Sequence, residues 1–292
     1  MAQAAVGGLT IEYETAGRPA DPPLLLIAGF GAQLIAWPRA FCERLAAGGR
    51  FVIAFDNRDC GLSSKIEGVL PDVPAIAAAA SSGDFELARA LAPYTLSDMA
   101  ADAAGLLSAL GIERAHVLGA SMGGMIAQTL AIEHPARVLS LTSMMSTTGE
   151  PGFGASTPEA REVLLKPAPP DRAGYIEASL NSLVWRSKRY PDAAAVQRLA
   201  GEAYDRCYCP EGVTRQFAAM IAGEPRAQKL RELCLPTLVM HGLDDTLIAP
   251  SGGERTAAMI PGASLLLIED MGHDRPEALW PKICGAILEH TA

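Results

Sequence analysis

A serine lies at the centre of a Gly-x-Ser-x-Gly motif, Gly119–Gly123. The motif follows the strand-like run Ala115–Leu118 and opens the helical pattern Met122–Glu133, which is the strand–turn–helix setting that gives it chemical meaning. The glycines permit a sharp turn, because a Cβ at Gly119 or Gly123 would collide with the neighbouring strand or helix. We therefore predict that Ser121 is a nucleophile on a strained turn; the alternative is a plain glycine-rich connection.

A serine hydroxyl needs a histidine base, and the histidine needs a carboxylate that orients it. Of the five histidines, His273 alone occupies a loop between the last predicted strand and the last predicted helix, whereas the others lie in strands, at the ends of elements or in the C-terminal tail. Loops at the carboxyl ends of parallel strands collect the reactive groups of a doubly wound sheet. His273 is therefore the predicted base.

Two adjacent aspartates, Asp244 and Asp245, follow another predicted strand and are the candidates for the acid. Adjacent side chains diverge in an extended or turning loop, so only one of the two can face His273. The chain order serine, aspartate, histidine is the order expected when three strand ends of such a sheet supply the groups. The residues alone leave the choice between the aspartates open.

The elements that must position these groups follow from the alternation of short apolar runs with longer helical patterns. This rhythm predicts an α/β fold with a mostly parallel sheet covered by helices on both faces. Leu9–Thr15 alternates apolar and polar residues and is expected to be an antiparallel edge strand. The strands expected to be buried on both faces are Leu24–Ala28, Phe51–Phe55, Ala115–Leu118, Val138–Met144, Thr237–Met240 and Ser264–Ile268. The predicted helices are Trp37–Ala47, Leu96–Leu110 (with a capping box at Thr95 and Asp98), Met122–Glu133, Gly252–Met259 and Pro276–Glu289.

Two segments interrupt the rhythm. Residues 146–224 lack a convincing buried strand and are expected to form a helical cap inserted into a core of residues 1–145 and 225–292. Lys65–Pro93 is a long connection of the kind that forms lids, binding loops or disordered segments. Aromatic residues of the cap line a substrate pocket or form the core of the cap; the candidate pocket residues are Leu34, Trp37, Trp185 and Tyr208.

The composition argues against several other classes of function. The net charge of −9, from 24 Lys and Arg against 33 Asp and Glu, lacks the basic footprint of a nucleic-acid-binding protein. Neither a signal peptide nor a membrane anchor is visible, so a cytoplasmic location and no membrane partner are expected. Six scattered cysteines fit free thiols. Cys207 and Cys209 have the wrong spacing for a metal half-site and are expected to be two buried thiols, and no metal or cofactor is predicted.

Over essentially its whole length the sequence resembles the α/β-hydrolase superfamily. More narrowly, it is similar to an esterase-like branch that includes bacterial polyketide methylesterases and lipase or thioesterase relatives. The matching segments are Leu24–Phe30, Phe55–Ser63, Gly119–Gly123, His241–Asp245 and Gly272–His273.

The resemblance implies roles for individual residues. The acid of the family is the third residue after the glycine of its loop, which is Asp245 here, and the Gly-Gly pair that follows at the family's interval is Gly252-Gly253. An oxyanion hole would be formed by the backbone N–H groups of Phe30 and Met122. The sequence departs from the family at Ala28, where a histidine is frequent.

The function implied is that of a serine hydrolase that cleaves carboxylic esters of small to medium apolar substrates through an acyl-enzyme. A C–C bond hydrolase or a cofactor-free peroxidase would use the same triad, and a non-catalytic small-molecule receptor would share the fold. The Asp56–Asp59 segment is expected to be a structural turn in which Arg58 pairs with Asp56 or Asp59.

Overall fold

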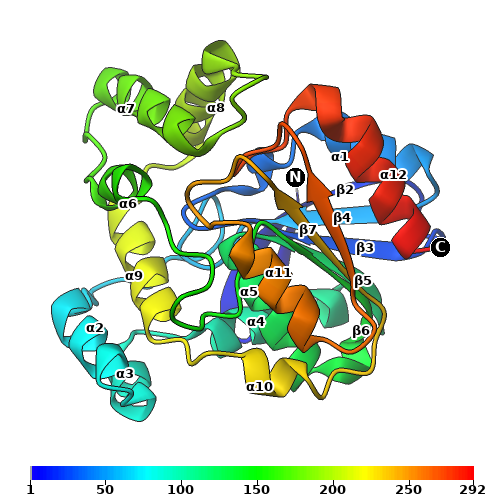
Figure 1. Ribbon diagram of the computed structural model, residues 1–292, viewed down its shortest axis with the longest axis horizontal. Helices are drawn as coiled ribbons and strands as arrows, with labels where there is room; N and C mark the ends of the chain where they lie inside the picture. Colours follow the sequence, from blue (N-terminus) through cyan, green and yellow to red (C-terminus); the bar gives the residue numbers. More distant parts are fainter. Residues whose placement is uncertain (1) are drawn as a thin grey trace.

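One eight-stranded sheet forms the centre of the computed structural model, which describes residues 2–292 (Figure 1). The strands are β1 (Ala2–Val6), β2 (Leu9–Ala16), β3 (Pro23–Ile27), β4 (Phe51–Phe55), β5 (Ala115–Ala120), β6 (Val138–Met144), β7 (Thr237–Gly242) and β8 (Ser264–Ile268). Their order is β1-β2-β4-β3-β5-β6-β7-β8. From β4 to β8 the neighbours are parallel, and β1 and β2 pair antiparallel. The predicted fold class is confirmed.

All seven predicted strands are present, but the two edges of the sheet differ from the prediction. The alternating strand β2 is not at the edge, because the short strand β1, which the sequence pattern missed, pairs with it. The edge at the other end is β8, where Leu265 is 41% exposed. Ser264–Ile268 is therefore not buried on both faces, although its apolar run resembles that of a central strand.

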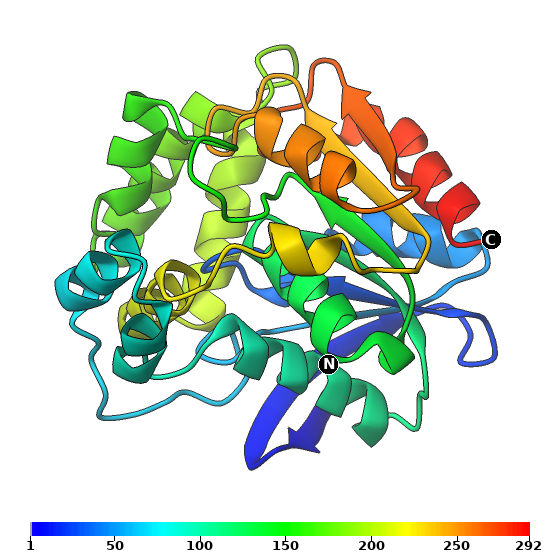
Figure 2. The same ribbon diagram turned by 60° about the horizontal axis from the view of Figure 1, so that its bottom comes forward.

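Helices cover both faces of the sheet (Figures 1 and 2). One face carries α1 (Arg39–Ala47) and α12 (Trp280–His290), and the other carries α4 (Leu96–Ala109), α5 (Met122–Glu133), α10 (Ala227–Leu230) and α11 (Ser251–Met259). The predicted capping box begins α4: Thr95 and Asp98 exchange hydrogen bonds. The last predicted helix begins as a short 3-10 turn, Glu277–Leu279, before α12.

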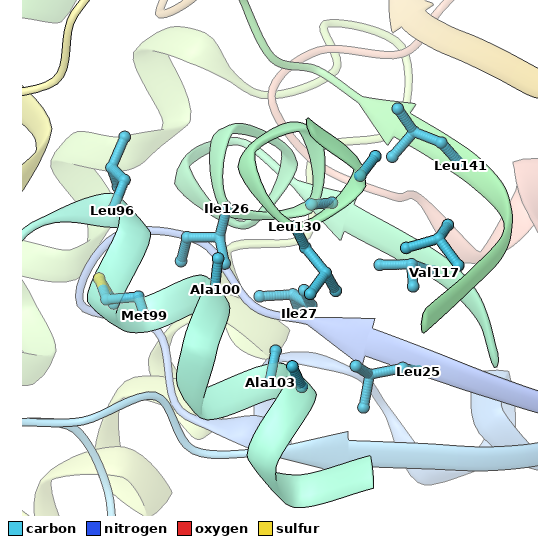
Figure 3. Close-up of a cluster of buried hydrophobic side chains, with 14 of the residues drawn as sticks. Leu25, Ile27, Leu96, Met99, Ala100, Ala103, Val117, Ile126, Leu130 and Leu141 are labelled. Atoms are coloured by element: carbon cyan, nitrogen blue, oxygen red, sulfur yellow. The ribbon is translucent and has the colours of Figure 1, made fainter. Parts of the chain in front are cut away.

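The α4 and α5 face holds the larger share of the core. Side chains of β3 and β5, such as Leu25, Ile27 and Val117, meet Met99 of α4 and Ile126 of α5 (Figure 3). All five are essentially inaccessible to solvent. This packing fixes the start of α5 against the carboxyl ends of the central strands, which is where the predicted reactive groups lie.

The segment Lys65–Pro93 is more ordered than predicted. It contains α2 (Val73–Ser81) and α3 (Phe85–Leu91), each begun by an aspartate side chain that accepts a backbone N–H of the first turn. Ile76 and Ala88 pack with Ala218 and Ala222 of the insertion. The two helices exclude the disordered alternative, whereas a lid or a binding loop remains a prediction.

The insertion between β6 and α10 is helical. Its elements are α6 (Pro158–Leu165), α7 (Arg172–Ser179), a 3-10 turn η3 (Leu180–Trp185), α8 (Ala193–Arg206) and α9 (Pro210–Ile221). Figure 1 shows these helices standing together beyond one end of the sheet. We refer to them as the cap.

Two buried carboxylates join the cap to the loop after β4. Asp56 accepts a hydrogen bond from Arg206 at the end of α8 (2.6 Å), and Asp59 accepts two hydrogen bonds from Arg215 of α9 (2.8 and 2.9 Å). Arg58, between them, turns away and pairs with Asp102 of α4 (2.6 Å). The prediction that Arg58 pairs with a neighbouring aspartate was wrong, because both aspartates bind arginines about 150 residues away in the sequence.

Replacing Arg215 by methionine should lower the free energy of unfolding by about 3–5 kcal/mol, because Asp59 would remain buried without its partner. Arg172→Met is the matched control: its bidentate bond to Asp205 is of the same kind but exposed, so stability should change little. Urea unfolding of both variants measures the difference. Equal loss in the two variants would contradict the role given to burial.

Candidate active site

Ser121 occupies a strained turn between β5 and α5. Its φ of 57° and ψ of −122° lie outside the regions that L-residues prefer. A Cβ on Gly119 would lie 2.0 Å from the Gly123 carbonyl oxygen, and one on Gly123 would lie 2.1 Å from the Ile27 carbonyl oxygen. The expected steric reason for both glycines is therefore present in the structure: neither position 119 nor position 123 has room for a side chain.

Backbone hydrogen bonds align the carboxyl ends of the neighbouring parallel strands along one edge of the sheet, the edge that runs across the strands. The Ser121 N–H donates to Met144 at the end of β6 (2.9 Å), and Met145 donates to Met240 in β7 (2.8 Å). Past β7, the N–H of Asp244 donates to Met271 in the loop after β8 (2.9 Å). The serine, the two aspartates and the histidine loop therefore lie along the carboxyl ends of consecutive strands.

Asp245 and His273 form a hydrogen bond at this edge. Oδ2 of Asp245 lies 2.7 Å from Nδ1 of His273, and Oδ1 accepts the N–H groups of Leu247 and Ile248 (2.9 Å each). Burial alone would raise the pKa of Asp245, but the charges and hydrogen bonds of His273 and His241 lower it to about 2. The bound carboxylate can hold the imidazole in one tautomer.

Asp244 has a different environment. It is only half-buried, and its Oδ2 accepts a single long bond from the N–H of Lys188 (3.3 Å). The contact with His273 thus falls on Asp245, the residue that the family resemblance implied.

A second histidine lies beside the same carboxylate. His241 is fully buried, with Nε2 2.8 Å from the Ile248 carbonyl oxygen and 3.3 Å from Oδ2 of Asp245. Gly253 makes room for it, since a Cβ there would lie 2.5 Å from the imidazole Nδ1. Sequence reasoning set this histidine aside as a strand end; its position four residues before Asp245 was the available signal.

The loop predicted to carry an oxyanion donor lies next to the serine. A Cβ on Gly29 would be 3.2 Å from Cβ of Ser121, so the residue after it, Phe30, begins beside the nucleophile position. Met122 is the first residue of α5, where N–H groups have no partner within the helix and the helix dipole is positive. In the part of the chain that the structure describes, the Ser121 hydroxyl makes no hydrogen bond to the His273 ring.

A short segment of the cap, residues 184–189, contacts both the loop that carries Asp245 and the loop that carries His273; we call it the cap strap. The Trp185 carbonyl accepts the backbone N–H of His273 (2.6 Å), and the Val184 carbonyl accepts the Thr246 hydroxyl (3.0 Å). Further bonds from the strap end on Asp244, Asp270 and Asp274. No sequence pattern indicates these contacts, because the cap strap makes most of them through its backbone atoms.

The four predicted pocket residues have different surroundings. Leu34 and Trp37 are buried in the core on the α1 and α12 face, where Trp37 stacks on Phe41, so their environment favours a core role over a pocket role. Tyr208 is half-buried in a cluster with the rings of Tyr175 and Tyr204, which lie 5.8 and 5.0 Å away. Trp185 is half-buried in the cap strap beside His273.

The cysteines differ from the prediction in one respect. Cys207 and Cys209 lie in the connection from α8 to α9 and are half-buried, so the prediction of two buried thiols was wrong. Among residues 2–292, no three His, Cys, Asp or Glu side chains are grouped as a metal site would require. In the same part of the chain, no helix is long and apolar enough to span a bilayer.

Residues 22–275 match the sequence model of the alpha/beta hydrolase fold. The chain belongs to the α/β-hydrolase family. Rhodomycin D methylesterase DnrP of Streptomyces peucetius is 32% identical over 97% of this chain and 95% of its own length, which places the chain with the esterase-like branch. A 2-hydroxy-6-oxononadienedioate/2-hydroxy-6-oxononatrienedioate hydrolase of Cupriavidus pinatubonensis is 31% identical over 58% of this chain and 59% of its own length. The enol-lactonase of Burkholderia xenovorans LB400 shares the fold, with a TM-score of 0.75 at 20% identity over 99% of both chains.

Replacing Asp245 by asparagine should lower kcat on the order of 10⁴-fold, because the amide favours the wrong imidazole tautomer. Asp244→Asn is the control and should leave kcat nearly unchanged, since that side chain makes only the bond to Lys188. Steady-state kinetics on a p-nitrophenyl ester compares the two. A larger loss at Asp244 would refute the assignment of the acid.

The depressed pKa of Asp245 should also appear in the stability of the fold. A carboxyl whose pKa falls from 3.8 to about 2 on folding stabilises the native state above pH 3.8, and this contribution disappears as the pH falls through about 2. The urea concentration at the unfolding midpoint should therefore decrease less between about pH 5 and about pH 2 for Asp245→Asn than for the wild type. Identical falls would show that Asp245 does not contribute.

Proposed function

We propose that this chain hydrolyses carboxylic esters of small to medium apolar molecules, with Ser121, His273 and Asp245 as the catalytic triad. The observation that carries the proposal is the 2.7 Å contact between Asp245 and His273, at the sheet edge where Ser121 stands on a strained turn. The 32% identity to a methylesterase over nearly the whole chain supports the same class of reaction. The nucleophile is a serine, which distinguishes it from hydrolases that attack through a carboxylate.

In this mechanism the Ser121 hydroxyl attacks the ester carbonyl while Nε2 of His273 takes its proton. Asp245 accepts the Nδ1–H of His273 and stabilises the imidazolium that forms. The proton then passes to the leaving alcohol, and an acyl-enzyme remains on Ser121. Water, activated by the same histidine, attacks the acyl-enzyme and releases the acid.

The negative charge that develops on the carbonyl oxygen needs preorganised donors. The N–H groups of Phe30 and Met122 are the proposed pair, since one loop lies against Ser121 and the other N–H opens α5. The helix dipole of α5 adds positive potential at the same place. Such donors contribute most when they are already aligned before the reaction.

The cap strap explains how the base loop stays in place. The carbonyl of Trp185 holds the backbone N–H of His273, and Asp274 of the same loop accepts the N–H of Ser187 (3.1 Å). The proposed substrate enters beneath the cap, whose half-buried aromatic side chains suit an apolar molecule. A methyl ester of such a molecule is the first substrate to test, because the Streptomyces relative is named as a methylesterase.

Replacing Ser121 by alanine should abolish ester hydrolysis, with kcat lower on the order of 10⁶-fold and the fold intact. A fluorophosphonate should label the wild type once, on Ser121, and should not label the variant. Methyl and p-nitrophenyl esters of increasing acyl length provide the activity measurement. A variant that keeps a tenth of the activity would show that Ser121 is not the nucleophile.

Hydrolysis of a C–C bond is the second candidate, since the Cupriavidus relative is named for a substrate that is not a simple ester. The same Ser121 and His273 would serve that reaction, so the S121A variant does not separate the two. A 2-hydroxy-6-oxo-dienoate compound tested beside the methyl esters does. Turnover of the dienoate with no turnover of any ester would replace the first proposal by the second.

A further inference from the structure

The loop that carries Phe30 is held at both ends by the segment after β4. The Asn57 amide donates to the Ala28 carbonyl (3.1 Å), and Asp56 accepts the N–H of Leu34 (2.6 Å). We call residues 28–34 the oxyanion loop. Asn57 and Asp56 therefore fix where the loop begins and ends, but they do not reach its middle.

The middle of the oxyanion loop is a tight turn. The N–H of Ala32 donates to the Gly29 carbonyl (3.2 Å), and Gly31 has a φ of 63°. A positive φ at the third position is the signature of a type II turn. The Gly29 carbonyl and the Phe30 N–H belong to one planar trans peptide and point in opposite directions, so the turn bond also sets the direction of the proposed oxyanion donor.

One side chain of the cap reaches this turn. Gln216 of α9 is 1% exposed; its Oε1 accepts the N–H of Gly31 (2.9 Å), and its Nε2 donates to the Arg58 carbonyl (2.9 Å). Because both ends of the amide are bound, its orientation is fixed. The bond to Gly31 holds the peptide between Phe30 and Gly31, which is the peptide that flips when a turn changes type.

The rest of α9 is packed so that Gln216 cannot move away. Arg215 binds Asp59 with two nitrogens, and the ring of Phe217 lies 5.8 Å from the ring of Phe30. Gly31 faces Val213, whose side chain would lie 3.5 Å from a Cβ at that position. Neighbouring residues of one cap helix thus contact the oxyanion loop and its support.

We propose that Gln216 is a positioning residue for the oxyanion hole: it locks the turn of the oxyanion loop so that the Phe30 N–H stays aimed at the developing charge. The inference rests on the proposed function and adds a cap residue to it. Gln216 contacts the loop through Gly31 and is not itself assigned a contact with substrate. Glycine at position 31 accepts either sign of φ, and the bond between Ala32 and Gly29 is compatible with both, so the acceptor on the Gly31 N–H favours one orientation of the central peptide.

Replacing Gln216 by methionine keeps the volume and removes both hydrogen bonds. We expect kcat on a p-nitrophenyl ester to fall about 10-fold to 100-fold, less than the loss of a donor itself, because the N–H remains but is less well aligned. KM should stay within about twofold, since the ground-state carbonyl depends little on the oxyanion donors. The pH dependence of kcat/KM should keep its shape, because Asp245 and His273 are untouched.

Two further variants separate this role from packing. Gln216→Glu keeps an oxygen that accepts the Gly31 N–H, and burial favours the neutral acid, whose O–H can donate to the Arg58 carbonyl in place of Nε2. This variant should retain most of the wild-type kcat. Thr214→Val, on the exposed side of α9, should match the wild type. If Q216M keeps the wild-type kcat, or if Q216M and Q216E lose it equally, the inference is overturned.

The same experiment distinguishes failure of this inference from failure of the proposed function. If the wild type has no ester hydrolysis that depends on Ser121, the proposed function fails. If the wild type is active through Ser121 and Q216M is equally active, the role of Gln216 fails and the proposed function stands. Thermal unfolding of each variant checks that the fold is retained; if Q216M is unfolded, a folded Q216E with strongly reduced kcat overturns the inference and one with retained kcat supports it.

Discussion

The backbone contact between α5 and the end of β3 is the constraint on which the site depends. A Cβ on Gly123 would lie 2.1 Å from the carbonyl oxygen of Ile27, so the helix can approach the strand only where the side chain is absent. This approach forces the left-handed conformation of Ser121 and brings the loop after β3 beside it. The strain at the serine is sustained by the core beneath it, where α5 buries its inner face against the sheet.

The cap is joined by many separate contacts to the end of the core that carries the proposed triad. On one side, Arg206 and Arg215 bind the carboxylates after β4, and Gln216 binds the loop after β3. On the other side, the cap strap bonds to the loops after β7 and β8. The cap therefore contacts the loops that carry the proposed oxyanion donor, acid and base, so it contributes to their geometry.

The sequence was informative wherever the signal was local. The turn around Ser121, the capping box at Thr95 and the parallel strands could be predicted because each depends on residue types within a short window. The choice of Asp245 over Asp244 needed the family resemblance, because local geometry says only that two adjacent side chains diverge. The predicted partners of Arg58 were wrong because a local signal was misleading. Proximity in sequence suggested a pair with Asp56 or Asp59, whereas these aspartates bind arginines of the cap and Arg58 binds Asp102.

Other features could not have been read from the chain. Gln216 contacts the oxyanion loop from another element, and only the fold decides how the two are placed. His241 differs, since its position four residues before Asp245 is a local signal, but one too weak to point to a contact with the acid. Leu34 and Trp37 are near Phe30 in sequence. After the loop, however, both side chains are buried in the core on the α1 and α12 face of the sheet. The irregular strap leaves no periodic pattern, since its contacts to the loops are made mainly by backbone atoms.

The two buried aspartates after β4 have a consequence for recombination between family members. A cap moved to another α/β-hydrolase would bring Arg206 and Arg215 to a loop whose residues were selected with a different cap. Without carboxylates at the positions of Asp56 and Asp59, each guanidinium would lose the buried carboxylate that it binds most closely here. A transferable module thus consists of the insertion plus the distant loop 56–59, and chimaeras cut only at the ends of the insertion separate groups that belong together.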